Sequence, residues 1–224
     1  MYVERSPGAS LAERIACVWV QDSAAEGTQL VVPDACVDLI WGPDGPHVAG
    51  PDTGPVPVRM RAGDVYRGIR FRPGALGGAL GVPADELRDG RIPFEELGLP
   101  SDLTLKELAE RLRATAAPDP AAPAIAGALR EGSSVRQVAW DLGLSERHLH
   151  RRSVAAFGYS PKVLQRIVRF QRALRLARSG VPLARVAVDS GYTDQAHLSH
   201  DVKRLSGVSM GRLLDPSPPS AEGF

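Results

Sequence analysis

The second half of the chain contains an internal duplication, and this repeat constrains the fold more than any other feature. Segment 134–157 reads SVRQVAWDLGLSERHLHRRSVAAF, and segment 182–205 reads PLARVAVDSGYTDQAHLSHDVKRL. When the two are aligned, similar residues coincide in the pairs Val135/Leu183, Val138/Val186, Ala139/Ala187, Gly143/Gly191 and Leu144/Tyr192. One extra residue in the second turn then pairs Leu149 with Leu198. Each copy therefore predicts a short helix, a turn and a second helix.

The residue types within each copy fit a helix-turn-helix. The alanine lets the two helices cross closely, and the glycine after the first helix adopts a left-handed conformation without steric cost. Ser145 in the first copy, and Thr193 and Asp194 in the second, are predicted to cap the second helix. In a helix-turn-helix the second helix enters the DNA major groove. Any corner between two helices can imitate one copy, so two copies in one region are the stronger signal.

A long helix is predicted between the copies, over residues 160–180. Ser160 caps it, Pro161 takes the first helical position, and Gly180 ends it. One stripe is apolar and comprises Val163, Leu164, Ile167, Val168, Phe170, Leu174 and Ala177. The rest of the surface carries arginines, of which we expect Arg166, Arg169 and Arg172 to brace this helix. A helix of about 18 residues is about 27 Å long, so it can hold two recognition helices near one DNA turn apart, about 34 Å.

Charge divides the chain in the same way as the repeat. Residues 1–120 hold 12 Lys and Arg against 18 Asp and Glu, whereas residues 121–224 hold 15 against 8. Within residues 133–214 the numbers are 14 and 5, a net charge of +9. This distribution is typical of a nucleic-acid-binding module joined to another domain. The alternative is a set of solvated helix faces without a partner.

The first hundred residues predict short strands between Gly and Pro turns. The predicted strands cover the end of 11–20 and the segments 30–32, 36–41, 55–60 and 66–71, and short helices are predicted at 76–80 and 83–87. A further helix is predicted over 102–114, with Ser101 as its cap, followed by a linker at 116–123.

The predicted fold is α+β with two domains. Residues 1–100 form a small β-rich domain of barrel or sandwich type with a sensing or regulatory role, and residues 101–124 form a helix and a linker. Residues 125–215 form an all-α DNA-binding domain with two helix-turn-helix units joined by a long helix. Residues 216–224 are expected to be a disordered tail.

The helical half resembles a known family. Residues 133–214 resemble the DNA-binding domain of the AraC/XylS family of bacterial transcription regulators, through the motifs LGLSERHLHRR, GYSPK and GYTDQAHLSHDVKRLSGVS. The resemblance implies that two helix-turn-helix units occupy successive major-groove segments. The chain departs from the family at Ser153 and Val202, where aromatic residues are usual, and at Met210, where proline is usual. These departures predict a first unit that is loosely packed or partly degenerate.

The N-terminal half resembles the β-rich domain of a shorter subgroup of these regulators. The matching segments are VVPDACVDLIWG, VAGPDTGP and GIRFRPGALGGALGV. The resemblance implies a sensing or regulatory domain and names no ligand.

The resemblance also implies which residues face DNA. The groove-facing positions are occupied by Arg147, His150, Arg151, Gln195, Ala196, Ser199 and His200. Arginine suits guanine, glutamine suits adenine, and an alanine methyl suits the thymine methyl. Lys203 and Arg204 lie further along and are expected to contact phosphate, which gives affinity without sequence preference. We expect His148 and His197 to support the fold rather than bind metal.

Polar residues in the first half suggest an effector pocket. Asp34, Cys36 and Asp38 alternate along one predicted strand and so share a face near Trp41. Two further residues, Arg70 and Arg72, are placed to bind an anionic effector if they face inward. The alternative is that all of these residues belong to the solvent-exposed faces of ordinary surface strands.

Two cysteines, Cys17 and Cys36, are too few for a disulfide scaffold or a four-thiolate zinc site. A redox switch between them is one hypothesis, and burial as small apolar residues is the other.

Several function classes are disfavoured. No catalytic triad, phosphate loop or metal-ligand spacing emerges, so we expect no catalytic residue, no metal, no cofactor and no enzymatic activity. A DNA-alkyl repair enzyme would need a cysteine cluster. Segment 15–20 is far shorter than the roughly 20 apolar residues that span a bilayer, and no secretory signal is seen, so we expect a cytoplasmic protein without a membrane partner.

The sequence therefore predicts a sequence-specific DNA-binding transcription regulator, modulated through its N-terminal domain. The alternative is a protein-interaction module with a degenerate DNA reader. Double-stranded DNA is the expected partner, and a small-molecule effector, RNA polymerase and a second copy of the chain are open as further partners.

Overall fold

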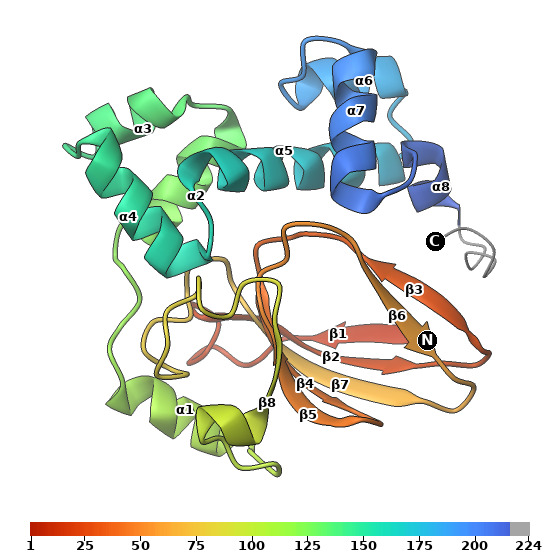
Figure 1. Ribbon diagram of the computed structural model, residues 1–224, viewed down its shortest axis with the longest axis vertical. Helices are drawn as coiled ribbons and strands as arrows, with labels where there is room; N and C mark the ends of the chain where they lie inside the picture. Colours follow the sequence, from red (N-terminus) through yellow and green to blue (C-terminus); the bar gives the residue numbers. More distant parts are fainter. Residues whose placement is uncertain (216–224) are drawn as a thin grey trace.

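A computed structural model describes residues 1–215 of the chain (Figure 1). The first part is β-rich, and the second part is helical and lies across one side of it (Figure 1). The strands are β1 (Tyr2–Arg5), β2 (Ile15–Asp22), β3 (Gly27–Val31), β4 (Val37–Gly42), β5 (Gly45–Ala49), β6 (Val56–Met60), β7 (Val65–Phe71) and β8 (Arg91–Pro93). The β-rich N-terminal part and the helical C-terminal part of the predicted fold class are confirmed.

The N-terminal strands form two antiparallel sheets. The larger sheet has the strand order β1-β2-β7-β4-β5-β8, and β3 pairs with β6 in a separate two-stranded sheet. Alternate residues of the central strands, such as Leu39 and Phe71, turn to one face of the large sheet. They form a core with Leu76, Leu80, Leu87, Leu108 and Leu112 from the segments that follow.

The predictions for this part were right at five strands and wrong at two helices. β2, β3, β4, β6 and β7 confirm the predicted strands, whereas β1, β5 and β8 were not predicted. Segments 76–80 and 83–87 are turns, closed by hydrogen bonds from Ala79 N to Leu76 O and from Leu87 N to Ala84 O. Helix formation is disfavoured there because three glycines lie between residues 77 and 81.

Helix α1 (Leu105–Ala114) begins later than predicted. A short 3-10 helix, η1 (Phe94–Leu97), precedes it. Thr104, rather than Ser101, is the N-cap: its hydroxyl accepts a hydrogen bond from Glu107 N at 3.2 Å, and Glu107 Oε2 accepts one from Thr104 N at 2.8 Å. This reciprocal capping box satisfies two N–H donors at once, so it outcompetes a single serine three residues earlier. Leu108 and Leu112 bury α1 against the N-terminal core.

The remaining helices are α2 (Ala122–Glu131), α3 (Val135–Asp141), α4 (Glu146–Phe157), α5 (Pro161–Arg178), α6 (Leu183–Asp189), α7 (Gln195–Ser206) and α8 (Met210–Leu214). The long α5 has the predicted cap, since Ser160 Oγ accepts from Val163 N and Pro161 follows. Leu164, Ile167 and Phe170 on its apolar stripe are fully buried. Helices α2, α3 and α4 pack near one end of α5, and α6, α7 and α8 pack near the other (Figure 1).

The predicted disordered tail at 216–224 lies outside the described residues. Within residues 1–215, no helix has both the length and the apolar character needed to cross a membrane.

Candidate nucleic-acid interface

The predicted repeat is present as two helix-turn-helix units, α3–α4 and α6–α7. Each turn contains a glycine in the left-handed region, Gly143 with φ 64° and Gly191 with φ 78°. Ser145 Oγ accepts from His148 N at 3.2 Å, and Asp194 Oδ1 accepts from His197 N at 2.7 Å, so Asp194 rather than Thr193 is the second cap. The second turn is one residue longer, as the alignment of the two copies predicted.

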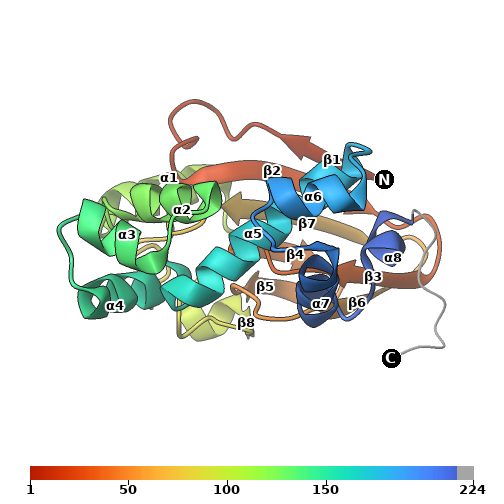
Figure 2. The ribbon, with the colours of Figure 1, turned by 90° about the horizontal axis from the view of Figure 1, so that it is seen from above.

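The second helices of both units lie on the same side of the molecule when it is viewed from above (Figure 2). Leu149 of α4 and Leu198 of α7 are buried against the helical core. The residues predicted to contact bases are all exposed, and these are Arg147, His150, Arg151, Gln195, Ala196, Ser199 and His200. Lys203 and Arg204 are exposed as well. Every side chain predicted to contact DNA is therefore accessible to solvent.

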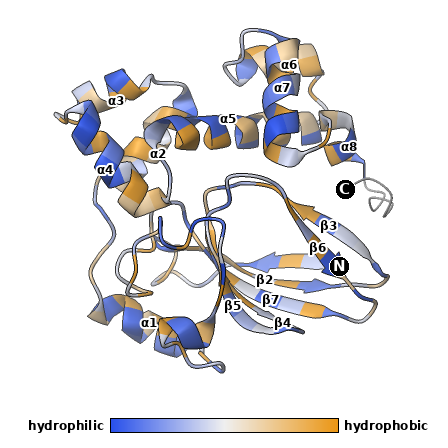
Figure 3. Cartoon of the chain, in the orientation of Figure 1, coloured by the Kyte–Doolittle hydropathy of each residue, from blue (hydrophilic) through white to orange (hydrophobic). Residues whose placement is uncertain are grey.

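Helix α4 changes character along its length. Its first turns, ERHLHRR, are hydrophilic, and its last turns, SVAAF, are mostly apolar (Figure 3). Arg147 and Arg151 therefore project from the polar part, whereas Phe157 is buried at the apolar end. The exposed side chains of α4 are therefore concentrated in its first turns, and its last turns pack against the rest of the protein.

The second unit is held to α5 by a buried ion cluster. Asp201 on α7 is 5% exposed, and its carboxylate accepts a hydrogen bond from Arg169 Nη2 at 2.5 Å. Arg166 Nε lies 3.8 Å from the other carboxylate oxygen. The guanidinium of Arg169 also stacks over the ring of Tyr192, 4.2 Å from its centroid. Arg166 and Arg169 thus act as the predicted braces, and Arg172 donates to the carbonyl of Arg130 at 3.5 Å.

Ser153 and Met210 do not loosen the helical domain. Ser153 is fully buried, and its hydroxyl donates to the Tyr159 carbonyl oxygen at 2.8 Å, so its polar atom is satisfied. Met210 and Val202 are both buried in the helical core. The prediction of a loosely packed first unit is therefore wrong, because the serine closes the corner between α4 and α5 by a hydrogen bond.

The histidines behave as structural or solvent-exposed groups. His197 packs edge-on against Tyr192 at 5.1 Å between ring centroids, and His148 is exposed. Among the described residues, no group of three His, Cys, Asp or Glu side chains is placed to hold a metal ion.

The predicted effector residues come together in part. Arg70 donates to both carboxylate oxygens of Asp38 at 3.1 Å and lies 3.8 Å from Asp34, while Cys36 N donates to Asp34 Oδ1 at 2.9 Å. Arg72 lies apart, because it is exposed and its Nε donates to the carbonyl of Ala12 at 2.7 Å.

Trp19 is a member of this cluster that the sequence did not suggest. Its indole N–H donates to Asp38 Oδ1 at 2.7 Å. Trp19 on β2 reaches Asp38 on β4 across β7, because its neighbour on β7 is Gly68, which has no side chain in the way. Burial raises the pKa of Asp38 to about 6, against the opposing effect of Arg70 and Trp19, which favour the charged form. Most polar atoms of the cluster are hydrogen-bonded to one another.

The two cysteines are free thiols. Burial raises the pKa of Cys17 to about 11, and burial also raises the pKa of Cys36. Both side chains are therefore protonated at neutral pH, which is the unreactive form of a thiol.

Asp119, Arg152 and Asp201 are residues with a role in the site that sequence reasoning missed. Arg152 binds Asp119 through Nε at 2.7 Å, and Asp201 binds Arg169, and the paired residues are 33 and 32 positions apart in the chain. Local periodicity carries no signal for such pairs. The alignment of the two copies contains a hint, because Arg152 and Asp201 occupy equivalent positions one residue after Arg151 and His200.

Two protein families match parts of the chain. Residues 138–215 match a family described as a helix-turn-helix domain, and residues 3–93 match a domain of unknown function, DUF6597. A comparison with curated proteins found no match.

Solved structures are similar at low identity. The C-terminal domain of AraT, a response regulator from Geobacillus stearothermophilus, is 22% identical with a TM-score of 0.41, covering 47% of this chain and 93% of that one. A probable AraC family transcriptional regulator from Rhodopseudomonas palustris is 21% identical with a TM-score of 0.36, covering 43% and 93%. Apo ToxT K231A from Vibrio cholerae is 11% identical with a TM-score of 0.49, covering 88% and 96%.

All three TM-scores are below 0.5, so the identity of the two domains rests on the two family matches and on the geometry of the two helix-turn-helix units. The chain therefore carries a helix-turn-helix domain at residues 138–215, preceded by a DUF6597 domain at residues 3–93, and the helix-turn-helix domain supports a role in DNA binding and transcription regulation.

Proposed function

We propose that the protein is a sequence-specific transcription regulator in which α4 and α7 read successive major-groove segments of double-stranded DNA. The observation that carries the proposal is the placement of two capped helices with exposed polar residues on the same side of the molecule, joined by one long helix (Figure 2). The surrounding region has a net charge of +9, which favours binding to a phosphate backbone.

Each exposed residue has a role that suits its chemistry. Arg147 and Arg151 bind guanine O6 and N7, Gln195 binds adenine N6 and N7, and the Ala196 methyl contacts a thymine methyl. His150, Ser199 and His200 donate to or accept from base edges. Lys203 and Arg204 contact phosphates and set the register of the protein on the duplex.

The N-terminal domain modulates DNA binding in this proposal. The support is its direct hydrogen bonding to the helical domain, for example from Gln171 Nε2 on α5 to the Pro33 carbonyl oxygen at 2.6 Å. Binding of an effector, of RNA polymerase or of a second copy of the chain stays a prediction from the sequence. An effector that enters the predicted pocket would have to reorganise the hydrogen-bonded group of Asp34, Cys36, Asp38 and Arg70.

An electrophoretic shift assay on DNA selected from a random pool tests the function. We expect the full chain to enrich a site with two conserved segments one helical turn apart. We also expect it to bind that site at least ten times more tightly than unrelated DNA at physiological salt. Equal binding to random competitor would refute specific recognition and favour the alternative of a protein-interaction module. The alternative was suggested by Ser153 and Met210, and both of these residues are buried in the core of the helical domain.

A further inference from the structure

The two helix-turn-helix units are held in place by different parts of the molecule. Arg152 on α4 and Asp201 on α7 occupy equivalent positions, because each lies seven residues after the N-cap of its helix, Ser145 or Asp194. Both form ion pairs, but their charges are opposite and their partners lie in different places. Asp201 binds Arg166 and Arg169 of α5, entirely within the helical domain.

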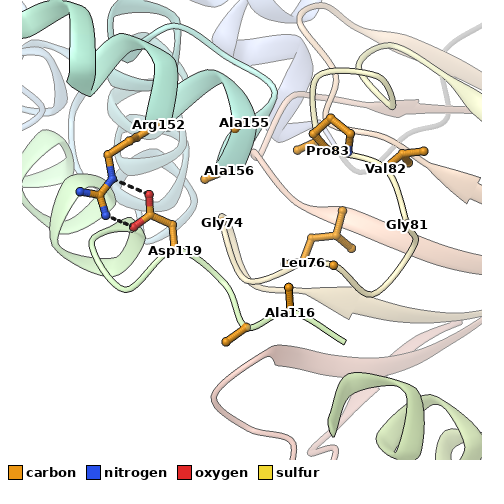
Figure 4. Close-up of a pocket in the computed structure, with 14 residues that line it drawn as sticks. Gly74, Leu76, Gly81, Val82, Pro83, Ala116, Asp119, Arg152, Ala155 and Ala156 are labelled. Carbon is orange, nitrogen blue, oxygen red and sulfur yellow. Dashed lines mark hydrogen bonds and ion pairs between the residues drawn. The ribbon is translucent and has the colours of Figure 1, made fainter. Parts of the chain in front are cut away.

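Arg152 instead binds the segment that joins the two domains. Its Nε donates to Asp119 Oδ2 at 2.7 Å, and its Nη2 donates to Asp119 Oδ1 (Figure 4). Asp119 lies just before α2, in the segment that connects α1 of the N-terminal domain to the helical domain. The hydrogen bonds from Arg152 lower the pKa of Asp119, so the pair is ionised at neutral pH.

The apolar end of α4 also contacts the N-terminal domain directly. Ala84 N donates to the Ala155 carbonyl oxygen at 3.1 Å, and Arg88 Nη1 donates to the Gly158 carbonyl oxygen at 3.0 Å. Just beyond α4, the Tyr159 hydroxyl donates to the Asp52 carbonyl oxygen at 2.5 Å. The first recognition helix is therefore bound at its C-terminal end to the N-terminal domain at three points besides the Asp119 pair.

A cavity of about 350 Å³ lies beside these contacts. Its walls come from the turn after β7, the linker and α4, and include Gly74, Leu76, Pro83, Ala116, Ala155 and Ala156 (Figure 4). Arg152 and Asp119 also line this cavity, so the ion pair lies at its wall. The end of α4 therefore has the cavity on one side, whereas its buried Phe157 packs in the helical core.

We infer that Arg152 and Asp119 are positioning residues that couple the first recognition helix to the N-terminal domain, whereas Asp201 positions the second recognition helix through α5. The inference rests on the proposed function. It follows that a change in the N-terminal domain alters how α4 reads its DNA segment more than it alters reading by α7. The N-terminal domain then controls chiefly the recognition of the DNA segment read by α4, and the contacts of α7 with its own segment maintain the affinity for DNA.

The test measures discrimination at each DNA segment separately. Arg147→Ala and Gln195→Ala first assign the two segments of the selected site to α4 and α7. Asp119→Asn and Arg88→Ala then weaken the contacts of α4, and Arg166→Ala weakens those of α7. Asp189→Asn is the matched control, since it breaks the exposed Arg185–Asp189 pair, whose two residues both lie on α6 with 2.9 Å between the paired atoms.

We expect Asp119→Asn and Arg88→Ala to reduce discrimination at the α4 segment by about fivefold or more and at the α7 segment by less than about twofold. Arg166→Ala is expected to show the reverse pattern, and Asp189→Asn to change neither. A thermal melt of each full-length variant verifies folding. Equal losses at both segments, or no loss for both Asp119→Asn and Arg88→Ala, would overturn the inference while leaving specific DNA binding by the parent chain intact. Failure of the parent chain to select any site would instead refute the proposed function.

Discussion

At the scale of single residues, the side chains of α4 divide between two tasks. Arg147 and Arg151 are exposed, whereas Ser153 two positions later is fully buried and donates to the Tyr159 carbonyl oxygen. Helical geometry makes this division sharp, because residues two apart point in different directions. Recognition and packing can therefore be changed separately in this helix.

Arg147→Ala should relax specificity without changing the salt dependence much. We expect a loss of about 1–3 kcal/mol of discrimination at one base pair, because a bidentate contact to guanine is removed.

Lys203→Ala should weaken binding to all sequences and lower the slope of log K against log salt by about 0.9, the value for one phosphate contact. Binding titrations at several salt concentrations distinguish the two outcomes, and a uniform loss for Arg147→Ala would contradict its assignment.

Ser153→Phe should destabilise the protein, although an aromatic residue is usual there in the family that the sequence resembles. The site is fully buried beside Tyr159, and a larger side chain forces its neighbours to move, at a typical cost of about 1–3 kcal/mol. Ser153→Ala is the control, with a loss of about 1 kcal/mol for the hydrogen bond. Urea unfolding measures both, and a stability gain with phenylalanine would show that the corner has spare room.

At the scale of elements, local signals located most of the helices. The caps Ser145, Ser160 and Asp194 and the turn glycines follow from short-range chemistry, and the structure has them where the sequence placed them. The start of α1 is the exception, because a serine and a threonine three residues apart compete for the same role. Thr104 is the N-cap because Glu107, three residues later, completes a capping box with it.

Thr104→Ala should therefore cost about 0.5–2 kcal/mol of unfolding free energy, because it removes the hydroxyl on which the capping box depends. Ser101→Ala should change stability by less than about 0.5 kcal/mol, as is usual for an exposed residue without a structural role. Thermal denaturation of the two variants side by side provides the measurement. A larger effect at Ser101 would mean that α1 begins where the sequence pattern first suggested.

At the scale of the whole molecule, the contact between the domains is asymmetric. Gly158 follows α4 and Gly207 follows α7, both with left-handed backbone, φ 76° and φ 73°. A Cβ at Gly158 would lie 2.7 Å from Cγ of Pro51 and 2.9 Å from the Ala84 carbonyl oxygen, both in the N-terminal domain. A Cβ at Gly207 would lie at an ordinary 3.6 Å from Cγ of Pro55.

Gly158→Ala should for that reason be more damaging than Gly207→Ala. Both substitutions carry the left-handed strain of about 1–2 kcal/mol, and only the first also forces the domains apart. We expect an additional loss of about 1–3 kcal/mol for Gly158→Ala, comparable to an overpacked core position. Chemical denaturation of the full chain gives the difference, and equal losses would argue against a tight interface at α4.

Interactions between near neighbours in the chain are determined by the sequence itself. The repeat, the caps and the apolar stripe of α5 depend on residues a few positions apart, and five of the strands depend on short apolar runs, so each leaves a local pattern. Pairings across the fold are decided only by the tertiary structure. Arg152 meets Asp119, Trp19 joins Asp38, and Arg72 turns away toward Ala12, because each depends on how distant segments are brought together. A side chain's distant partner is set by the packing of sheets and helices, and no local preference encodes it.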